Sequence, residues 1–312
     1  MHMGVYDPIR LRVIVFGGID SDGAYASGVW ALSLSGVPSW SQLSPTGTPP
    51  SNRAFHTAIY DPVRDRMLLF GGLSGLAGHA VDELWVLSLS GAPAWTQLAP
   101  TGTPGQRFAH TAIYDPVRDQ LVVFGGYAEP SNTYVNDVWK LSFGSLTWAQ
   151  VTTSGSPPGA GYGASAVYDP VADQMVVFGG YDGVAATVSA DASALTIATS
   201  SWAPVAPSGS PPSGRYLHAA IYDAGAGRMV VFGGVLDGVT PLRDAPALSL
   251  SGSPSWSALP QLGGTGPGGR GDRPVTIYDP VRDRIVTFGG DQGSVSTSDV
   301  WALSLVATPS WT

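Results

Sequence analysis

The sequence predicts an all-β protein made of six copies of one unit. The tripeptide Phe-Gly-Gly recurs at steps of 54, 54, 54, 54 and 56 residues, beginning at Phe16, Phe70, Phe124, Phe178, Phe232 and Phe288. Gly and Pro are abundant, at 41 and 26 of 312 residues, whereas the chain has one Lys and two Glu, the residues that usually cover helix surfaces. A period of this length is typical of arrays in which each unit stacks on its neighbours.

The second unit shows the four strands that we expect in each copy. An inner strand at 56–60 ends in the turn 61–65, where Asp61 can bond the main chain ahead of it and Pro62 fixes φ. A wholly apolar strand at 67–70 stops at a double glycine, where φ is positive or a side chain would clash. A variable loop precedes a third strand at 84–89, an outer strand at 95–98 and a Pro/Gly-rich crossing to the next unit.

Most aromatic residues recur in register, which predicts a structural role for them. Each unit has a Phe before the double glycine, a Tyr ten residues earlier and a Trp in the outer strand, and four units add a Trp in the third strand. We expect these 22 rings to pack between units. The third-strand Trp is replaced by Ser193 in the fourth unit and by Pro246 in the fifth, which predicts less regular sheets there.

The double glycine, the downstream Trp and the period near 50 residues resemble the kelch repeat. The resemblance, to bacterial kelch-repeat proteins and the central domain of galactose oxidase, covers nearly the whole chain. It implies a six-bladed β-propeller of four-stranded blades, with the inner strand lining a channel and the Trp strand outermost. We expect a single domain over 1–312, with residues 1–4 a remnant of cloning and blades at about 5–44, 52–99, 106–152, 160–206, 214–260 and 270–312.

The two chain ends predict a truncated seam where such a ring closes. From Trp311 through the termini to Tyr6 there are far fewer residues than between the corresponding positions inside the chain. We expect residues 4–7 to supply a stub of an inner strand and residues 308–312 a shortened outer strand. Trimming of the ends and origin in a longer parent protein remain alternative explanations.

Composition excludes several classes of function. The net charge of −8 argues against a nucleic-acid partner, which would require a basic surface. The absence of Cys removes disulfides, cysteine zinc sites and the Tyr–Cys cofactor of galactose oxidase, and we expect neither a cofactor nor a metal. No apolar run is long enough to span a membrane, and no leader follows Met1. We expect a monomer, and the resemblance favours a secreted or cell-surface location with any leader removed.

The aromatics outside the repeat pattern mark a candidate site. Eight of the nine fall either in the loop after a double glycine or in the lead-in segment, the few residues before each inner strand. In a propeller these segments share one end, the loop mouth, where function usually sits. The predicted ligand-binding residues are Arg53, Arg107, Arg215, Tyr127, Tyr134, Tyr162, Tyr181 and Tyr216.

Structural interpretations of the same residues stay open. The rings could pack loops onto blades, and each Arg-x-x-His element could place Arg as a loop brace and His against a neighbouring blade's backbone. Asp82, Asp137, Asp244 and Asp299 recur before the third strand, which favours a structural role for them.

Three functions fit these features. The first is a scaffold that binds a protein or peptide segment at the mouth. The second is an enzyme acting on sugars or sugar acids there, as in isomerases with kelch rings, and the third is a structural surface module without a ligand. No hydrolase elbow, Walker loop or zinc-protease motif is present, so we favour binding over catalysis, with a glycan as another partner to consider.

Overall fold

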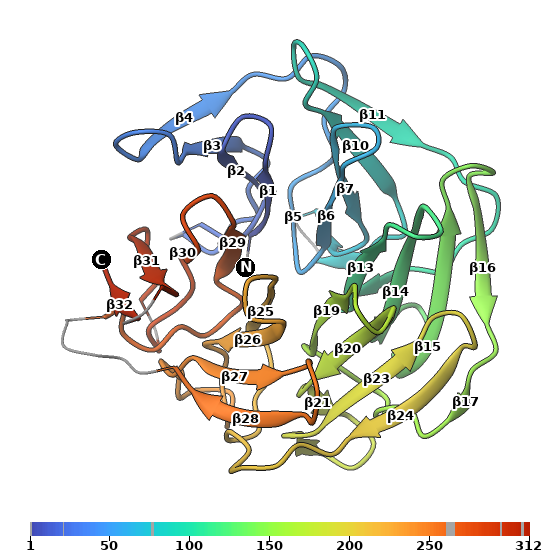
Figure 1. Ribbon diagram of the computed structural model, residues 1–312. Helices are drawn as coiled ribbons and strands as arrows, with labels where there is room; N and C mark the ends of the chain where they lie inside the picture. Colours follow the sequence, from blue (N-terminus) through green and yellow to red (C-terminus); the bar gives the residue numbers. More distant parts are fainter. Residues whose placement is uncertain (1, 21, 76–77, 260–265, 294, 307–308) are drawn as a thin grey trace. The chain divides into compact units, whose positions relative to one another are not determined.

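The computed structural model describes residues 2–20, 22–75, 78–259, 266–293, 295–306 and 309–312 (Figure 1). Within these ranges the chain forms strands, turns and loops and contains no helix, so the all-β prediction is confirmed. The described part accordingly holds no helix that could cross a membrane. The chain divides into two compact units, unit 1 (Met1–Val151) and unit 2 (Thr152–Thr312).

Unit 1 contains three antiparallel sheets whose four main strands follow chain order from one edge to the other. The first sheet consists of β1 (Met3–Asp7), β2 (Arg12–Phe16), β3 (Val29–Ser33) and β4 (Ser39–Leu43). The second consists of β6 (Thr57–Asp61), β7 (Arg66–Phe70), β10 (Leu84–Ser88) and β11 (Ala94–Leu98). The third consists of β13 (Thr111–Asp115), β14 (Gln120–Ala128), β15 (Thr133–Ser142) and β16 (Thr147–Val151).

Unit 2 repeats the same plan in three further sheets. The fourth sheet consists of β19 (Ser165–Asp169), β20 (Gln174–Phe178), β23 (Ala192–Thr196) and β24 (Ser201–Val205). The fifth consists of β25 (Ala219–Asp223), β26 (Arg228–Phe232), β27 (Pro246–Ser249) and β28 (Ser255–Ala258). The sixth consists of β29 (Val275–Asp279), β30 (Arg284–Phe288), β31 (Val300–Ser304) and β32 (Ser310–Trp311).

Short strands, apart from β17, complete the loops at one end of these sheets. In unit 1, β5 (Arg53–Ala54), β8 (Leu73–Ser74) and β9 (His79–Ala80) form a small sheet, and β12 (Arg107–Phe108) pairs with β14. In unit 2, β18 (Gly161–Tyr162), β21 (Tyr181–Asp182) and β22 (Thr187–Val188) form another, and β17 (Ser154–Gly155) lies parallel to β24. The lead-in segments of the second to sixth sheets each pair with the loop that follows their own double glycine.

The recurrent Asp turn is held by the bonding that the sequence suggests. The Asp61 carboxylate is fully buried, accepts the Val63 and Arg64 N–H groups at 3.0 and 3.2 Å, and accepts Arg66 Nε at 2.8 Å. Arg64 then reaches the next sheet, where its guanidinium binds both oxygens of Asp119 at 2.9 and 2.5 Å. Local turn chemistry and a bidentate ion pair thus fix the end of the sheet opposite the loops.

The double glycine is required by a close approach of the next sheet. Gly71 has φ near +67°, and a Cβ placed on it would lie 2.7 Å from the Arg107 carbonyl oxygen and 2.9 Å from His110 Cε1. Gly179 repeats this relation in unit 2, with the Arg215 carbonyl at 2.5 Å and His218 Cε1 at 2.9 Å. The motif therefore exists because one sheet packs its lead-in segment directly on its neighbour's backbone.

The cores lie between successive sheets, where Phe packs on Trp. In four of the six sheets the Phe before the double glycine contacts the outer-strand Trp of the following sheet, with ring centroids 5.0–5.2 Å apart; the pairs are Phe16–Trp95, Phe70–Trp148, Phe178–Trp256 and Phe232–Trp311. The prediction that in-register aromatics pack between successive repeats is confirmed for these rings. Phe143, which lies outside the pattern, stacks with Tyr114 and sits under Arg64 and Arg66.

One of the two expectations about irregular sheets needs correction. The fourth sheet is regular despite Ser193, because β23 pairs along its whole length with β20 and β24. The fifth sheet is shortened as expected: β27 begins at Pro246, and its pairing with β26 stops at Ala247. Proline has no N–H for the ladder, whereas serine keeps its N–H, so only the proline interrupts pairing.

The chain ends differ from expectation at one side. β1 is a full-length inner strand paired with β2 from Met3 to Asp7, rather than a stub. β32 is short, with two residues paired to β31, as expected for the last outer strand. Residue 308, which we placed in that strand, lies outside the described residues.

Candidate functional site

The lead-in segments and the loops after the double glycines pair directly, which gathers the candidate aromatics. Phe108 pairs with Tyr127, Tyr162 pairs with Tyr181, and Tyr216 bridges to Val235. The aromatics outside the repeat pattern thus meet at one end of their own sheets, as the sequence predicts.

In unit 1 these rings form a continuous series. Phe55 contacts Phe108 at 6.0 Å between ring centroids, Phe108 contacts Tyr127 at 5.3 Å, and Tyr127 contacts Tyr134 edge-on at 5.1 Å. All four side chains are partly exposed. Tyr127 and Tyr134 face each other across the β14–β15 hairpin, in the part that extends beyond the double glycine.

In unit 2 three tyrosines form a mutually contacting cluster, the tyrosine triad Tyr162, Tyr181 and Tyr216. Their ring centroids are 5.6, 5.7 and 5.8 Å apart, with tilted and edge-on geometries. Each ring is partly exposed and comes from a different segment. Burial, with the carboxylates of Asp272 and Asp237 nearby, raises the pKa of the Tyr216 hydroxyl, so this hydroxyl is neutral at physiological pH.

Exposed apolar side chains lie on the loops of unit 2, a feature that the sequence analysis missed. Val184 is 80% exposed and Val239 is 70% exposed, and both follow Asp-Gly steps after a double glycine. Leu236 and Val295 are also exposed in the corresponding loops. The carboxylates of Asp182 and Asp237 each accept two main-chain N–H groups, which fixes the tight turns that present these valines. We call the tyrosine triad with Val184, Leu236, Val239 and Val295 the loop surface of unit 2.

The three candidate arginines are buried rather than displayed. Arg53, Arg107 and Arg215 are 0–2% exposed. Arg107 donates from Nη1 to the Gly125 carbonyl at 3.1 Å and forms a bidentate pair with Asp137 at 2.8 and 3.0 Å. Arg215 repeats this arrangement with the Gly233 carbonyl at 3.2 Å and with Asp244 at 2.7 and 2.8 Å. The structure therefore places these guanidinium groups as braces beneath the loops, and they do not present a cation to solvent.

In the second and third sheets, the acid that completes the brace also accepts a hydrogen bond from the third-strand Trp. Asp137 accepts Trp139 Nε1 at 2.6 Å. In the second sheet this acid is Glu83 rather than the expected Asp82: Glu83 pairs with Arg53 at 2.5 Å and accepts Trp85 Nε1 at 2.9 Å. The longer glutamate side chain reaches Arg53 from one position further along the chain. The spacing of the Asp residues alone did not predict this substitute. The prediction of a structural role is thus confirmed for Asp137 and Asp244.

The lead-in segments are tied sheet to sheet through their main chains. The Ala109 N–H donates to the Phe55 carbonyl at 2.9 Å in unit 1. In unit 2 the Leu217 N–H donates to the Gly163 carbonyl at 2.8 Å, and the Arg273 N–H donates to the Leu217 carbonyl at 2.7 Å. These donors, with Phe55, have φ between +51° and +57°, a conformation that persists only where surroundings enforce it. The aromatic clusters consequently stand on a preorganised base.

Two histidines of the Arg-x-x-His elements, His110 and His218, link neighbouring sheets through hydroxyl groups. His110 Nε2 lies 2.9 Å from Thr57 Oγ1, and His218 Nε2 lies 2.6 Å from Ser165 Oγ. His218 also has the expected backbone contact, to Phe178, in addition to this side-chain partner on the preceding sheet. Burial, with Arg215 and Arg273 nearby, lowers the pKa of His218 well below its ordinary value.

The depressed pKa of His218 predicts a loss of stability on acidification. The folded protein keeps this ring neutral, while the unfolded chain binds a proton below about pH 6.5, so acid favours unfolding. We expect the unfolding free energy to fall by up to about 1.4 kcal/mol per pH unit from this group below that pH. We expect the unfolding free energy, measured by urea denaturation with signals from unit 2, to depend less steeply on pH between pH 7 and 5 in His218→Asn than in the wild type. The exposed His79 provides the control. If His218→Asn and His79→Asn show the same dependence of unfolding free energy on pH, His218 is not the group responsible.

No cluster of three metal-ligating side chains occurs among the described residues. The candidate site is accordingly an aromatic and apolar loop surface over buried ion pairs.

Comparison with known proteins places this geometry in a family. Residues 13–240 match the family described as Attractin/LZTR1 beta-propeller, and residues 170–312 match the KLHDC2/KLHL20/DRC7 Kelch-repeats domain. Multiple epidermal growth factor-like domains protein 8 of Mus musculus is 31% identical over 231 residues, which are 72% of this chain and 8% of that protein. Host cell factor 1 of Homo sapiens is 30% identical over 189 residues, 54% of this chain and 9% of that protein.

A solved structure entitled "Structure of YjhT" has the same fold. Its TM-score is 0.74 with 15% sequence identity, and the match covers all of this chain and 96% of the other. The chain spans less than a tenth of the length of the curated relatives it matches. The prediction of a kelch-type propeller is confirmed: with its sheets, double glycines and matched span of 228 residues, the chain belongs to the Attractin/LZTR1 β-propeller family of kelch-repeat proteins.

Proposed function

We propose that the protein is a binding module whose loop surface of unit 2 docks a segment of a partner protein. The observation that carries the proposal is the tyrosine triad, three mutually contacting and partly exposed rings from three segments. We also propose that the six repeats of the chain form one six-bladed domain.

The composition of the surface suits a protein partner. Tyr is enriched at the centres of protein interfaces because its ring gives large contact area and its hydroxyl still reaches a polar group. Exposed apolar residues around such rings add area that a partner can remove from water. Val184 and Val239 supply this area from turns whose conformation the Asp side chains fix.

The base beneath the triad lowers the cost of binding. Tyr216 is preceded by the fully buried Arg215 and followed by Leu217, which is held by the Gly163 carbonyl. A surface already ordered before contact loses little conformational entropy when a partner docks. The candidate arginines thus act in the proposal as positioning residues rather than as ligands.

The relatives support a module within a larger protein. The matching region makes up 8% of the mouse protein, whose name states that it has multiple epidermal growth factor-like domains. A propeller embedded in a much longer chain suits a role in recognition.

Selection of peptides from a random display library tests this function. Peptides enriched on the wild-type protein should bind Tyr181→Ala or Tyr216→Ala about tenfold more weakly, because each truncation removes a central interface ring. Tyr134→Ala in unit 1 is the matched control, since Tyr134 also belongs to an exposed aromatic cluster, and its affinity should match wild type. Equal peptide affinity of Tyr181→Ala and the wild type would show that the tyrosine triad is not the binding site. Failure to enrich any peptide above background would contradict the proposed binding function.

A further inference from the structure

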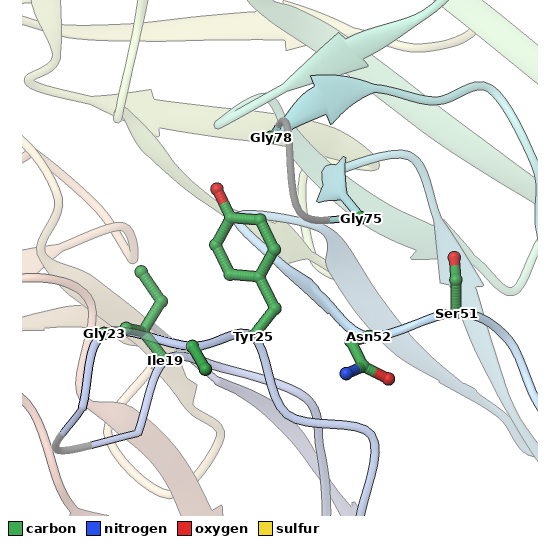
Figure 2. Close-up of a pocket in the computed structure, with 8 residues that line it drawn as sticks. Ile19, Gly23, Tyr25, Ser51, Asn52, Gly75 and Gly78 are labelled. Atoms are coloured by element: carbon green, nitrogen blue, oxygen red, sulfur yellow. The ribbon is translucent and has the colours of Figure 1, made fainter.

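A pocket lies on the loops of the first two sheets, within unit 1. Its volume is about 570 Å³, and it is lined by Ile19, Gly23, Ala24, Tyr25, Ser51, Asn52, Gly75 and Gly78. Figure 2 shows Tyr25 between the segment that carries Ile19 and Gly23 and the segments that carry Gly75, Gly78 and Ser51. The volume falls within the range of about 300–1,000 Å³ typical of small-ligand sites.

Tyr25 is set in the pocket by a compact turn. The Asp20 carboxylate accepts the Asp22 and Ala24 N–H groups at 3.0 and 2.9 Å, and Ile19 bridges to Tyr25 across the turn. The Ala26 N–H then donates to the Gly18 carbonyl at 3.0 Å. The ring is only partly buried, and its hydroxyl makes no hydrogen bond to another described residue.

The second wall supplies polar groups in fixed positions. Ser51 Oγ lies 2.5 Å from Ser74 Oγ and accepts Arg53 Nη2 at 3.0 Å, while Arg53 Nε donates to the Ser51 carbonyl at 3.1 Å. Next to it, the exposed Asn52 side chain has no hydrogen-bond partner in the described part of the chain. The buried Arg53 therefore positions a hydroxyl beside an amide that is still able to donate and accept.

Glycines keep the pocket open. A Cβ placed on Gly23 or Gly75 would have no heavy atom within 4 Å, whereas one on Gly78 would lie 3.0 Å from Tyr25 Oη. Gly23, Gly75 and Gly78 have φ of +79°, +74° and +63°, so their backbone also favours glycine. Side chains at the first two positions would project into free space next to the ligand-accessible volume.

From this geometry we propose that the pocket binds a neutral saccharide unit. The lining residues that the structure describes supply an aromatic ring, two hydroxyls, an amide, aliphatic groups and glycine main chain, and none of them has a charged side chain. A charged ligand would lose hydration without a paired partner in that lining. Sugar hydroxyls both donate and accept, matching Tyr, Ser and Asn, and the C–H face of a pyranose ring can cover the Tyr25 ring.

A peptide is the less suitable occupant of this pocket. Peptide recognition by strand addition requires an open strand edge, and helix docking requires an apolar groove. Here β8 is covered on both sides by β5 and β9, and among the described lining residues Ile19 is the one large aliphatic side chain. The inference is independent of the proposed protein-binding surface, because every lining residue belongs to unit 1.

Titration with defined sugars tests the proposal. The probes are the methyl glycosides of glucose, galactose, mannose and N-acetylglucosamine and their disaccharides, with glucuronic acid as the charged comparison, followed by saturation-transfer NMR and calorimetry. At least one neutral probe should bind, and Tyr25→Ala should weaken it about tenfold through loss of the covered ring. Asn52→Ala should weaken it as well.

A pair of glycine substitutions separates occupancy from folding. Gly75→Asn should abolish sugar binding, because asparagine tolerates φ near +74° and its side chain would occupy the pocket. Gly36→Asn is the matched control, since Gly36 also has φ of +74° and open space but lies in the β3–β4 turn, and it should bind as wild type. The proposal is overturned if no neutral probe binds, if glucuronic acid binds more tightly, or if Gly75→Asn binds as well as Gly36→Asn. Selected peptides binding in a Tyr25-dependent manner would overturn it in favour of a peptide site.

Discussion

Replacing Asp137 with alanine is expected to lower the free energy of unfolding by about 3 kcal/mol. The substitution leaves the Arg107 guanidinium, 2% exposed, without the carboxylate that binds both of its terminal nitrogens. It also removes the acceptor of Trp139 Nε1. Urea denaturation followed by Trp fluorescence measures the change.

The fourth sheet provides a matched control for this prediction. Asp191 occupies the position equivalent to Asp137. The lead-in segment of its sheet has Gly161, however, at the position where those of the second, third and fifth sheets have Arg53, Arg107 and Arg215. Asp191 is exposed, and its carboxylate contacts Ser189. Asp191→Ala should therefore change the unfolding free energy by less than about 0.5 kcal/mol. Equal losses in the two variants would show that the ion pair beneath the loops does not stabilise the fold.

Replacing Gly71 with alanine is expected to be at least as damaging, at about 3 kcal/mol or more. The new Cβ would combine a positive φ with a position 2.7 Å from the Arg107 carbonyl oxygen, which is held by the next sheet. Relief of the clash requires the two sheets to separate, which would disturb the Phe70–Trp148 contact.

Gly91→Ala isolates the part of that loss due to contact between sheets. Gly91 has φ of +68°, nearly identical to Gly71, but a Cβ there would meet no heavy atom within 4 Å. It should cost about 1–2 kcal/mol, the strain of a left-handed alanine alone. If Gly71→Ala costs no more than Gly91→Ala in urea denaturation, close packing is not the reason for the double glycine.

The repeat made most of the fold predictable from sequence. Strand order, the Asp turn and the Phe–Trp packing follow from residues that recur at fixed spacing, because each copy must make the same contacts with its neighbour. The regularity of the fourth sheet was not predicted. It arises because Ser193 retains the main-chain N–H that the ladder needs. The loss of a large ring there leaves strand pairing intact.

The candidate site was predictable in part. The tyrosines outside the repeat could be found by subtraction, and the structure brings Tyr162, Tyr181 and Tyr216 together. The depth of the arginines could not be found this way, because residue type alone does not distinguish an exposed guanidinium from one buried on Asp137 or Glu83. The pocket around Tyr25 depends on open space beside glycines, which requires three-dimensional coordinates.

Amide hydrogen exchange of the protein with a selected peptide tests the central claim most directly. Binding at the loop surface of unit 2 predicts slower exchange in segments 161–163, 181–189, 214–217 and 235–242, with little change in the turns 61–65 and 115–119. Protection confined to those turns, or to the Tyr127–Tyr134 hairpin, would contradict the assignment of partner binding to the tyrosine triad.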